Sequence, residues 1–458
     1  SNDELAGPTG PIRRARIRHV VTSRRFLAAL DRPSPVEASN AGSAGTLFLE
    51  DLRPDRNHRV LAWLLTLLPT ALLDRLVDRG QGGRSAATIL FSSGSGGVPK
   101  GVVLSHANLL ANVESLGNAT SIGAGDVVLG ALPFFHAFGL TGTLWTPLLR
   151  GASVVWHADP TDARGVAEAC ERHRPTVLLG TPTFARSWLR RVDPNSLERV
   201  RLAAVGAEKL RGDLADAWRE RFGHDLLEGY GCTELAPAVA FNLPDSGRGA
   251  GGERAARRGT VGRPLPGVAV RVVDRETRAL VRPGVEGAIL ARGANVMEGY
   301  LDDLEATRRA IRDGWYDTGD VGQVDEEGFL ELTGRASRFS KIGGEMVPHC
   351  RVEAALIDAA QALAASDHGI ELAVVGVPDE RKGERLVVLH TSLAIEPEAL
   401  VAEARRRELP ALFTPRAADF FEVEHLPLLG SGKLDLRRAQ ELALAWVAEG
   451  RLASPTGC

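Results

Sequence analysis

The residues best suited to chemistry form a glycine- and hydroxyl-rich loop, FSSGSGGVPKG at 91–101, directly after the apolar run at 87–90. Glycine lets a backbone turn tightly and approach a ligand, and successive N–H groups in such turns form a concavity that binds anions. The loop is therefore a candidate polyphosphate site with the candidate contacts Ser92, Ser93, Gly94, Ser95, Gly96, Gly97 and Lys100. It departs from the Walker pattern because Gly101 and Val102 follow the lysine. A flexible loop without a ligand is the alternative.

Five further segments combine glycine with aromatic, hydroxyl or charged side chains. In chain order they are PFFHAFG (133–139), GYGCTE (229–234), YDTGD (316–320), GR (334–335) with KIGGE (341–345), and LPLLGSGK (426–433). Only five of the 55 basic residues are lysines, and three of them, Lys100, Lys341 and Lys433, fall in these six segments. A lysine offers a compact ammonium on a flexible stem, which a planar guanidinium cannot replace. The three lysines in these segments are therefore expected to make specific contacts that arginine could not make.

Length and composition bound the class of protein. A chain of 458 residues is expected to form two or three domains, and a net charge of −3 provides no basic field for nucleic acid. The four cysteines lack CxxC spacing, which predicts neither a zinc site nor a disulfide framework and favours a reducing, cytoplasmic location. The chain begins with Ser-Asn and has methionine only at 297 and 346, so we expect a cleavage scar or a fragment.

The most apolar segment is VLAWLLTLLPTALL at 60–73. It is shorter than the roughly 20 residues that a membrane-spanning helix needs. We expect a buried helix that breaks near Pro69. The alternative is an interfacial helix, which would give the protein peripheral contact with the inner face of a membrane.

Apolar runs alternate with helical stretches between residues 86 and 290, which predicts parallel α/β sheets with crossover helices. Short strands between Gly and Pro turns at 259–333 predict a small β subdomain. A compact α+β unit is expected after Gly334. The predicted fold class is therefore α/β, with a large N-terminal domain of parallel α/β sheets plus a small β subdomain at 1–333 and a small α+β C-terminal domain at 334–458.

The six segments, in this order and spacing, resemble the adenylate-forming, AMP-binding superfamily of acyl-CoA synthetases, luciferase-type enzymes and peptide-synthetase adenylation domains. The resemblance covers residues 86–440. The stretches LEGYGCTELAPAVAFN, RFSKIGGEMV and LPLLGSGKLD look most like the synthetase part of the bifunctional 2-acylglycerophosphoethanolamine acyltransferase/acyl-acyl-carrier-protein synthetases. The resemblance implies that a carboxylate attacks the α-phosphate of ATP to give acyl-AMP and pyrophosphate, and that a thiol then takes the acyl group.

The resemblance also implies roles for individual residues. The loop from Ser92 to Gly97 would hold the β- and γ-phosphates, and Glu234 would ligate Mg²⁺, which prefers carboxylate and phosphate oxygens. Tyr230 would cover the adenine, and Asp320 would accept the ribose hydroxyls. A flexible lysine would reach the α-phosphate and the carboxylate together, so the catalytic candidates are Lys433, Glu234, Thr233 and His136. Further nucleotide-binding candidates are Gly206, Ala207, Glu208, Gly229, Gly231 and Arg335.

In this superfamily the C-terminal domain is a mobile lid that rotates after adenylation. The resemblance places the hinge at 334–337, and the expected hinge and thiol-transfer residues are Ser337, Lys341, Gly343 and Gly344. Related sequences often carry Asp or Lys where Ser337 stands, so the hinge departs from the usual pattern here. For Lys341 an ordinary surface charge is the alternative.

His136 stands where amino-acid-activating relatives place an aspartate, so we expect a substrate without an α-amino group; a core histidine is the alternative. The expected acyl pocket is mostly apolar, which favours an aliphatic acid, and its lining is Phe134, Phe135, Phe138, 181–184 and 205–208. The leading hypothesis is ATP- and Mg²⁺-dependent ligation of a fatty or other aliphatic acid to acyl carrier protein or CoA.

Two other functions stay open at the level of sequence. One is a plain medium- or long-chain acyl-CoA synthetase. The other is a non-catalytic nucleotide- or lipid-binding derivative of the fold. Fewer residues precede the phosphate loop than in most relatives, so we expect the earliest segment of the large domain to be missing.

Overall fold

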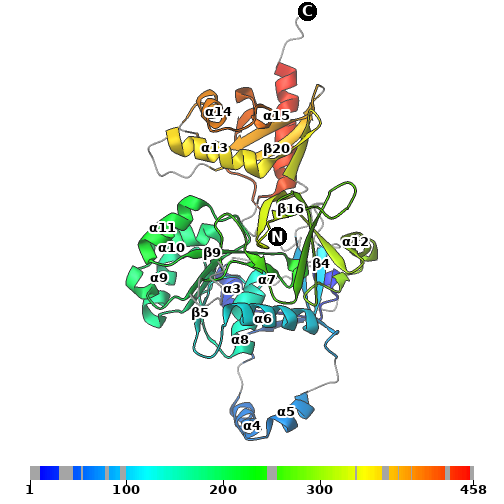
Figure 1. Cartoon of the computed structure of the whole chain (residues 1–458). Coiled ribbons are helices and arrows are strands. Elements are labelled where there is room, and N and C mark those ends of the chain that lie inside the picture. The colour runs from blue at the N-terminus through cyan, green and yellow to red at the C-terminus, as the bar shows by residue number, and fades with distance from the viewer. Residues whose placement is uncertain are drawn as a thin grey trace, which may run out of the picture.

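The computed structural model describes residues 11–29, 45–52, 55–77, 82–92, 100–244, 255–335, 338–363, 371–379, 381–393, 395–428 and 434–453. As predicted, a large N-terminal α/β domain is followed by a small C-terminal domain. Figure 1 shows the small domain, in yellow to red, at one end of the molecule.

A seven-stranded sheet forms the centre of the large domain. Its order is β11-β10-β9-β8-β7-β5-β6, with β5 to β9 parallel and the last two strands antiparallel. Successive side chains face opposite sides, so that Val128 and Leu129 belong to different core clusters. The strands are β5 Val127–Gly130, β6 Ser153–Trp156, β7 Val177–Gly180, β8 Leu202–Val205, β9 Leu226–Gly231, β10 Ala238–Phe241 and β11 Arg263–Pro264.

Helices cover both faces of this sheet. One face packs on α9 Ala163–His173, α10 Pro182–Arg191 and α11 Gly212–Phe222, where Trp188 and Trp218 are fully buried (Figure 1). On the other side lie α6 His106–Thr120, α7 Ala137–Gly139, the π-helix Leu140–Trp145 and α8 Thr146–Arg150. Ser105 caps α6 through a reciprocal hydrogen-bond pair with Asn108, which fixes the start of the helix.

The strands around the glycine-rich loop depart from the predicted parallel pattern. Strand β3 Ala86–Ser92 and β4 Lys100–Ser105 form an antiparallel hairpin, and β14 Gly299–Tyr300 adds to it. The physical reason is that a parallel crossover needs a dozen or more residues, and the segment 93–99 is too short. The hairpin pairs Ser92 with Lys100, so the two ends of the loop are held side by side.

The predicted β subdomain is an antiparallel sheet in the order β12-β13-β16-β15, with β17 beside β16. Its elements are β12 Val268–Val273, β13 Gly287–Gly293, α12 Leu304–Ala310, β15 Ile311–Arg312, β16 Trp315–Val324 and β17 Leu330–Arg335. Strand β17 continues two residues past the predicted boundary at 333, and Arg335 pairs with Asp320 of β16. Gly334 and Arg335 are thus sheet residues, while Ser337 lies outside the described residues.

The C-terminal domain has its own apolar core, built around Val352, Leu356 and Val388. It contains β18 Phe339–Ile342, β19 Glu345–Pro348, α13 His349–Leu363, β20 Leu372–Asp379, β21 Gly383–His390, α14 Pro397–Arg406, β22 Phe420–Glu422 and α15 Leu436–Ala453. The domain contacts the large domain where Arg211 Nη2 donates to Asp358 Oδ1 at 2.9 Å and to Gln361 Oε1 at 3.1 Å.

The N-terminal part includes a correction to the sequence-based prediction. The described elements are α2 Pro11–Arg14, β1 His19–Thr22, α3 Arg24–Ala29, β2 Gly45–Phe48, α4 Arg56–Thr66 and α5 Thr70–Val77. The apolar segment 60–73 does break at Pro69, as predicted. However, α4 buries none of its residues, so the prediction of a buried helix is wrong. Within the described residues, no helix combines the length and apolarity needed to cross a bilayer.

Gly231, at the end of β9, lies close to the backbone that leads into β10 and leaves no room for a side chain. A Cβ at this position would lie 2.1 Å from the carbonyl oxygen of Pro237. We expect Gly231→Ala to lower the free energy of unfolding in urea by about 1–3 kcal/mol, because the strand ends must separate. The matched control is Gly212→Ala, where a Cβ would meet no atom within 4 Å. Equal stability of the two variants would contradict the role given to Gly231.

Candidate functional site

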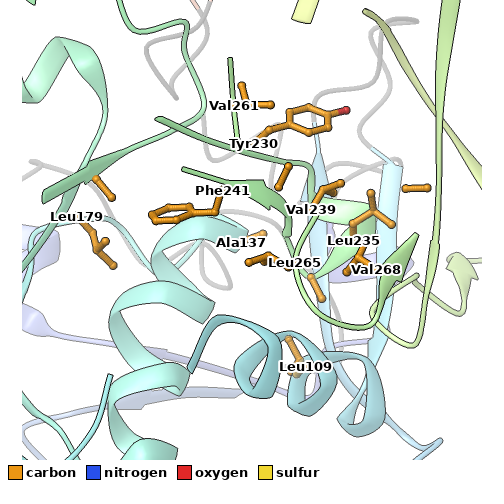
Figure 2. Close-up of a cluster of buried hydrophobic side chains, with 14 of the residues drawn as sticks. Leu109, Ala137, Leu179, Tyr230, Leu235, Val239, Phe241, Val261, Leu265 and Val268 are labelled. Atoms are coloured by element: carbon orange, nitrogen blue, oxygen red, sulfur yellow. The ribbon is translucent and has the colours of Figure 1, made fainter. Parts of the chain in front are cut away.

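The candidate site lies where the central strands end, at the edge where parallel sheets bind ligands. Strand β9 carries Tyr230 and leads into a single 3-10 turn, Thr233–Leu235, which contains the predicted Thr233 and Glu234. The ring of Tyr230 belongs to the main core cluster, and Figure 2 shows its hydroxyl at the margin of that cluster. The core therefore fixes the ring and leaves the hydroxyl to make polar contacts.

The first polar group of the site is centred on Asp320, which is only 4% exposed. Its Oδ2 accepts a hydrogen bond from the Tyr230 hydroxyl at 2.5 Å, and its Oδ1 accepts one from Arg335 Nε at 2.8 Å. Burial and the Asp320 carboxylate raise the pKa of the Tyr230 phenol, which keeps it protonated as a donor. The Asp320 charge likewise raises the pKa of Arg335. Three predicted nucleotide-binding residues are thus in direct contact.

The second polar group is centred on Glu234. Its Oε1 accepts a hydrogen bond from the Tyr300 hydroxyl at 3.0 Å. The Lys100 ammonium lies 4.8 Å from the centre of the Tyr300 ring, a cation–π distance. Tyr300 also hydrogen-bonds with Tyr316, whose pKa is raised by burial. The predicted loop lysine and the predicted magnesium carboxylate are therefore joined through one tyrosine.

Tyr300 and Tyr316 were missed by sequence reasoning, although a signal was available. The chain has only three tyrosines, at 230, 300 and 316, and all three lie in the two polar groups. Cys232 lies near both groups. Burial raises the pKa of its thiol, and the negative charges of Glu234 and Asp320 raise it further. The low tyrosine content could have pointed to these positions.

Two predicted segments are described only through their flanks. Ser93, Gly94, Ser95, Gly96 and Gly97 lie outside the described residues, while Ser92 and Lys100 pair across the hairpin that carries them. Lys433 also lies outside the described residues. Around it, Leu428 and Leu434 form an antiparallel bridge, and Asp435 N–H donates to Pro427 O at 2.8 Å. Each loop is therefore fixed at both ends.

The predicted acyl-pocket residues are only partly assembled. Phe138 packs near Gly206, but Phe134 and Phe135 are 42% and 66% exposed, so these two do not form an enclosed wall as predicted. The Phe135 ring lies 4.4 Å from the ring of His136 at a tilt of 50°, and His136 is half-buried. The physical reason is that both phenylalanines lie on the turn before α7, where the Phe134 ring packs edge-on against Trp156 at the end of β6 and the Phe135 side chain is left largely in solvent.

Glu208 is turned toward α10 and the end of β7. Its Oε2 accepts a hydrogen bond from the Thr183 hydroxyl at 2.6 Å, and Ala207 before it has a positive φ of 69°. A cavity of about 360 Å³ opens here, and its charged lining is mostly cationic: Arg186, Arg190, Lys209, Arg211 and Glu208. Arg186 and Arg211 are each paired with Asp213. Of the predicted acyl-pocket lining, Pro182, Thr183 and Glu208 border this cavity, so that part of the lining is polar rather than apolar.

The C-terminal candidates lie on one hairpin. Gly343 and Gly344, with φ of 58° and 93°, join β18 to β19 in a two-residue turn that requires positive φ at both positions. Lys341 precedes this turn and is exposed, and its backbone N–H donates to the Glu384 carboxylate. The hairpin therefore presents the lysine to solvent in the described orientation of the domains.

Glu228, also missed by sequence reasoning, is the most perturbed acid near the site. It lies two residues before Tyr230 on the same side of β9 and is 8% exposed. Burial raises its pKa to about 7, opposed by the Leu210 N–H and the Lys209 charge.

Among the described residues, no three His, Cys, Asp or Glu side chains cluster as a metal site. Glu234 alone suits Mg²⁺ carried by a polyphosphate, because that ion needs only one or two carboxylates.

Comparison with known families decides the relationship. The AMP-binding enzyme family matches residues 14–301, and the AMP-binding enzyme C-terminal domain matches residues 360–433. The chain belongs to the AMP-binding enzyme family. The family resemblance inferred from the six segments is therefore confirmed.

Curated relatives of this AMP-binding enzyme include CoA ligases. A long-chain-fatty-acid–CoA ligase of Bacillus subtilis (strain 168) is 32% identical over 365 residues, which cover 78% of this chain and 61% of the relative. A benzoate–CoA ligase of Thauera aromatica is 32% identical over 356 residues, covering 75% and 64%. The chain thus spans less than two thirds of the length of these relatives.

Solved structures with the same fold carry nucleotides. ATP-bound MatB from Rhodopseudomonas palustris gives a TM-score of 0.76 at 27% identity, covering 94% of this chain and 80% of MatB. The o-succinylbenzoate CoA synthetase MenE of Bacillus subtilis, in complex with its acyl-adenylate OSB-AMP, gives 0.76 at 23% identity, covering 96% and 81%. The second likeness concerns the fold alone.

Glu228 predicts a pH dependence of stability. Its pKa is about 7 in the folded enzyme against 4.5 for an ordinary glutamate. Between these values the unfolded chain ionises first, so the folded state loses stability as pH rises through this window. We expect Glu228→Gln to remove this loss and to gain up to about 3 kcal/mol above pH 7, with little change below pH 4.5.

The measurement is urea unfolding of the wild type and Glu228→Gln as a function of pH. The matched control is Glu298→Gln, since Glu298 is exposed. If the wild type and Glu228→Gln gave parallel stability profiles across the window, Glu228 would not have the raised pKa.

Proposed function

We propose that the protein is an ATP-dependent acid–thiol ligase that activates a fatty or other aliphatic carboxylic acid as its acyl-AMP and passes the acyl group to a thiol. The observation that carries the proposal is the convergence of two polar groups on the end of β9. One is centred on Asp320 and the other on Glu234. Membership of the AMP-binding enzyme family supports the same assignment.

The first group would bind the nucleoside. Asp320 would accept the ribose hydroxyls, since a carboxylate held by Tyr230 and Arg335 is already oriented. Because the Tyr230 ring is fixed by the core, it would provide a rigid wall for adenine.

The second group would handle the phosphates. Glu234 would hold Mg²⁺, and its Oε1 accepts the hydrogen bond from Tyr300 that orients the carboxylate. The bound ion would offset phosphate charge, as it does in other phosphoryl-transfer enzymes. Lys100 and the loop that follows Ser92 would lie along the β- and γ-phosphates, because their hairpin adjoins β14, which carries Tyr300.

The reaction brings two anions together, so positive charge must be placed at the α-phosphate. A carboxylate oxygen attacks the α-phosphorus, and the bond to the β-phosphate oxygen breaks to release pyrophosphate. Thr233, on the turn after β9, and Lys433 would stabilise the charge that develops. In the second step a thiolate attacks the acyl carbonyl, the bond to AMP breaks, and the thiol proton passes to solvent. The Ser337 hinge, Lys341, Gly343 and Gly344 would act in this step, after rotation of the C-terminal lid that begins near residue 334.

The thiol acceptor is CoA or acyl carrier protein. The relatives named above are CoA ligases, whereas the stretches LEGYGCTELAPAVAFN and LPLLGSGKLD favour carrier protein. Arg190 and Lys209, in the cavity beside Thr183, would suit the phosphate of phosphopantetheine, which both acceptors share. The apolar residues around Phe138 and Gly206 favour an acid without charge on its tail.

The test of the proposed function is ATP–pyrophosphate exchange across straight-chain acids from short to long. We expect exchange that depends on an aliphatic acid and on Mg²⁺. Glu234→Gln should lower it by about 10²–10³, as loss of a group that stabilises transition-state charge does. The exposed Glu298→Gln is the matched control and should retain full exchange. ATP binding without exchange for any acid would reject the ligase and leave the non-catalytic derivative.

Lys433 should separate the two half-reactions. We expect Lys433→Ala to abolish formation of acyl-AMP while transfer from preformed acyl-AMP to CoA or carrier protein is retained, because the ammonium is needed only at the α-phosphate. Lys382→Ala, at an exposed lysine of the same domain, is the control and should leave both steps intact. Equal loss of both half-reactions in Lys433→Ala would contradict the role of Lys433.

A further inference from the structure

Two consecutive helices, α4 and α5, expose most of their apolar side chains. Eight large apolar residues of the two helices and the link between them are 36–63% exposed: Val60, Leu61, Trp63, Leu64, Leu65, Leu67, Leu72 and Leu76. Figure 1 shows the helix pair at the end of the molecule opposite the C-terminal domain. A folded protein rarely leaves so large an apolar surface in water without a partner.

The apolar residues are arranged as a helical face. In α4, positions 60, 61, 64 and 65 recur at helical spacing, and Trp63 widens the face beyond half of the circumference. Arg59 and Thr66 lie on the opposite side of the helix. A face of this width suits a helix that lies in a membrane interface, with its apolar side among the acyl chains and its polar side toward water.

The charges around this face favour an anionic medium. Residues 55–77 contain three arginines, at 56, 59 and 75, and two aspartates, at 55 and 74, which gives +1 in a chain of net charge −3. The Asp55 carboxylate is engaged within α4, where it accepts a hydrogen bond from the His58 N–H at 2.8 Å. Trp63 is 62% exposed, and tryptophan is the side chain that settles best at a membrane–water interface.

We propose that α4 and α5 form a docking surface for an anionic phospholipid bilayer. The helices would lie in the plane of the interface, with the leucines and Trp63 among the acyl chains and Arg56, Arg59 and Arg75 at the lipid phosphates. They lie on the surface rather than span it, because neither helix has the required length. This inference rests on exposure and charge and does not depend on the proposed function.

The first experiment is flotation of the full chain with phosphatidylcholine vesicles and with mixed phosphatidylcholine–phosphatidylglycerol vesicles. We expect binding to the mixed vesicles. The triple variant Leu61→Gln, Leu64→Gln, Leu65→Gln should lower the partition coefficient on the order of a hundredfold, since each leucine loses its transfer from water. The matched control carries Leu280→Gln, Val285→Gln and Leu304→Gln, which are equally exposed elsewhere and should bind as the wild type does.

A charge variant, Arg56→Gln, Arg59→Gln, Arg75→Gln, should lose the preference for anionic vesicles and keep the helical circular dichroism of the wild type. Vesicles with brominated acyl chains should quench tryptophan fluorescence, and Trp63→Phe should remove most of this quenching although six other tryptophans remain.

Three results would overturn the proposal. The first is equal vesicle binding by the wild type and the triple leucine variant. The second is quenching that survives Trp63→Phe. The third is a wild-type dimer that the triple leucine variant converts to monomer while neither binds vesicles, since a second copy of the chain would then cover this face. ATP–pyrophosphate exchange without vesicles keeps a failed docking surface distinct from a failed enzyme.

Discussion

The candidate site depends on one buried carboxylate and its two partners. Asp320 would be costly to bury as an isolated charge, and its contacts with Tyr230 and Arg335 offset that cost. Those partners come from different parts of the large domain, because Tyr230 ends a strand of the central sheet and Arg335 ends the last strand of the β subdomain. The carboxylate therefore fixes how the two sheets meet and, with them, the position of the site.

The same contact reaches the start of the C-terminal domain. Arg335 ends β17 and the first strand of the C-terminal domain, β18, begins at Phe339, so the Asp320 carboxylate holds the chain just where the two domains join. Glu234 plays a comparable part on the other side of β9, where Tyr300 ties it to the sheet that carries the glycine-rich loop. Two carboxylates, each held by a tyrosine, thereby bring four sequence-distant segments to one strand end.

The sequence predicted the elements whose pattern is local. The strand–helix alternation predicted between residues 86 and 290 is present from β5 to β9, because hydrophobic periodicity and end residues decide such elements. The prediction of a buried helix at 60–73 failed, because an apolar run becomes buried only when another part of the protein covers it. The contacts of Tyr300 and Tyr316 and the raised pKa of Glu228 depend on which strands become neighbours, and no local pattern in the chain encodes that.

The contact between the domains has a consequence for how the small domain is held. Arg211 reaches Asp358 and Gln361 through a partly exposed side chain. Exposed ion pairs contribute about 0–1 kcal/mol and are screened by salt. Arg275 of the large domain adds a cation–π contact at 4.6 Å with Phe339 at the start of the small domain, so the arrangement rests on more than the Arg211 pair, and only a ligand that prefers another arrangement by more than these terms would repopulate the ensemble. The Arg211 contact with Asp358 therefore restrains movement of the small domain only weakly.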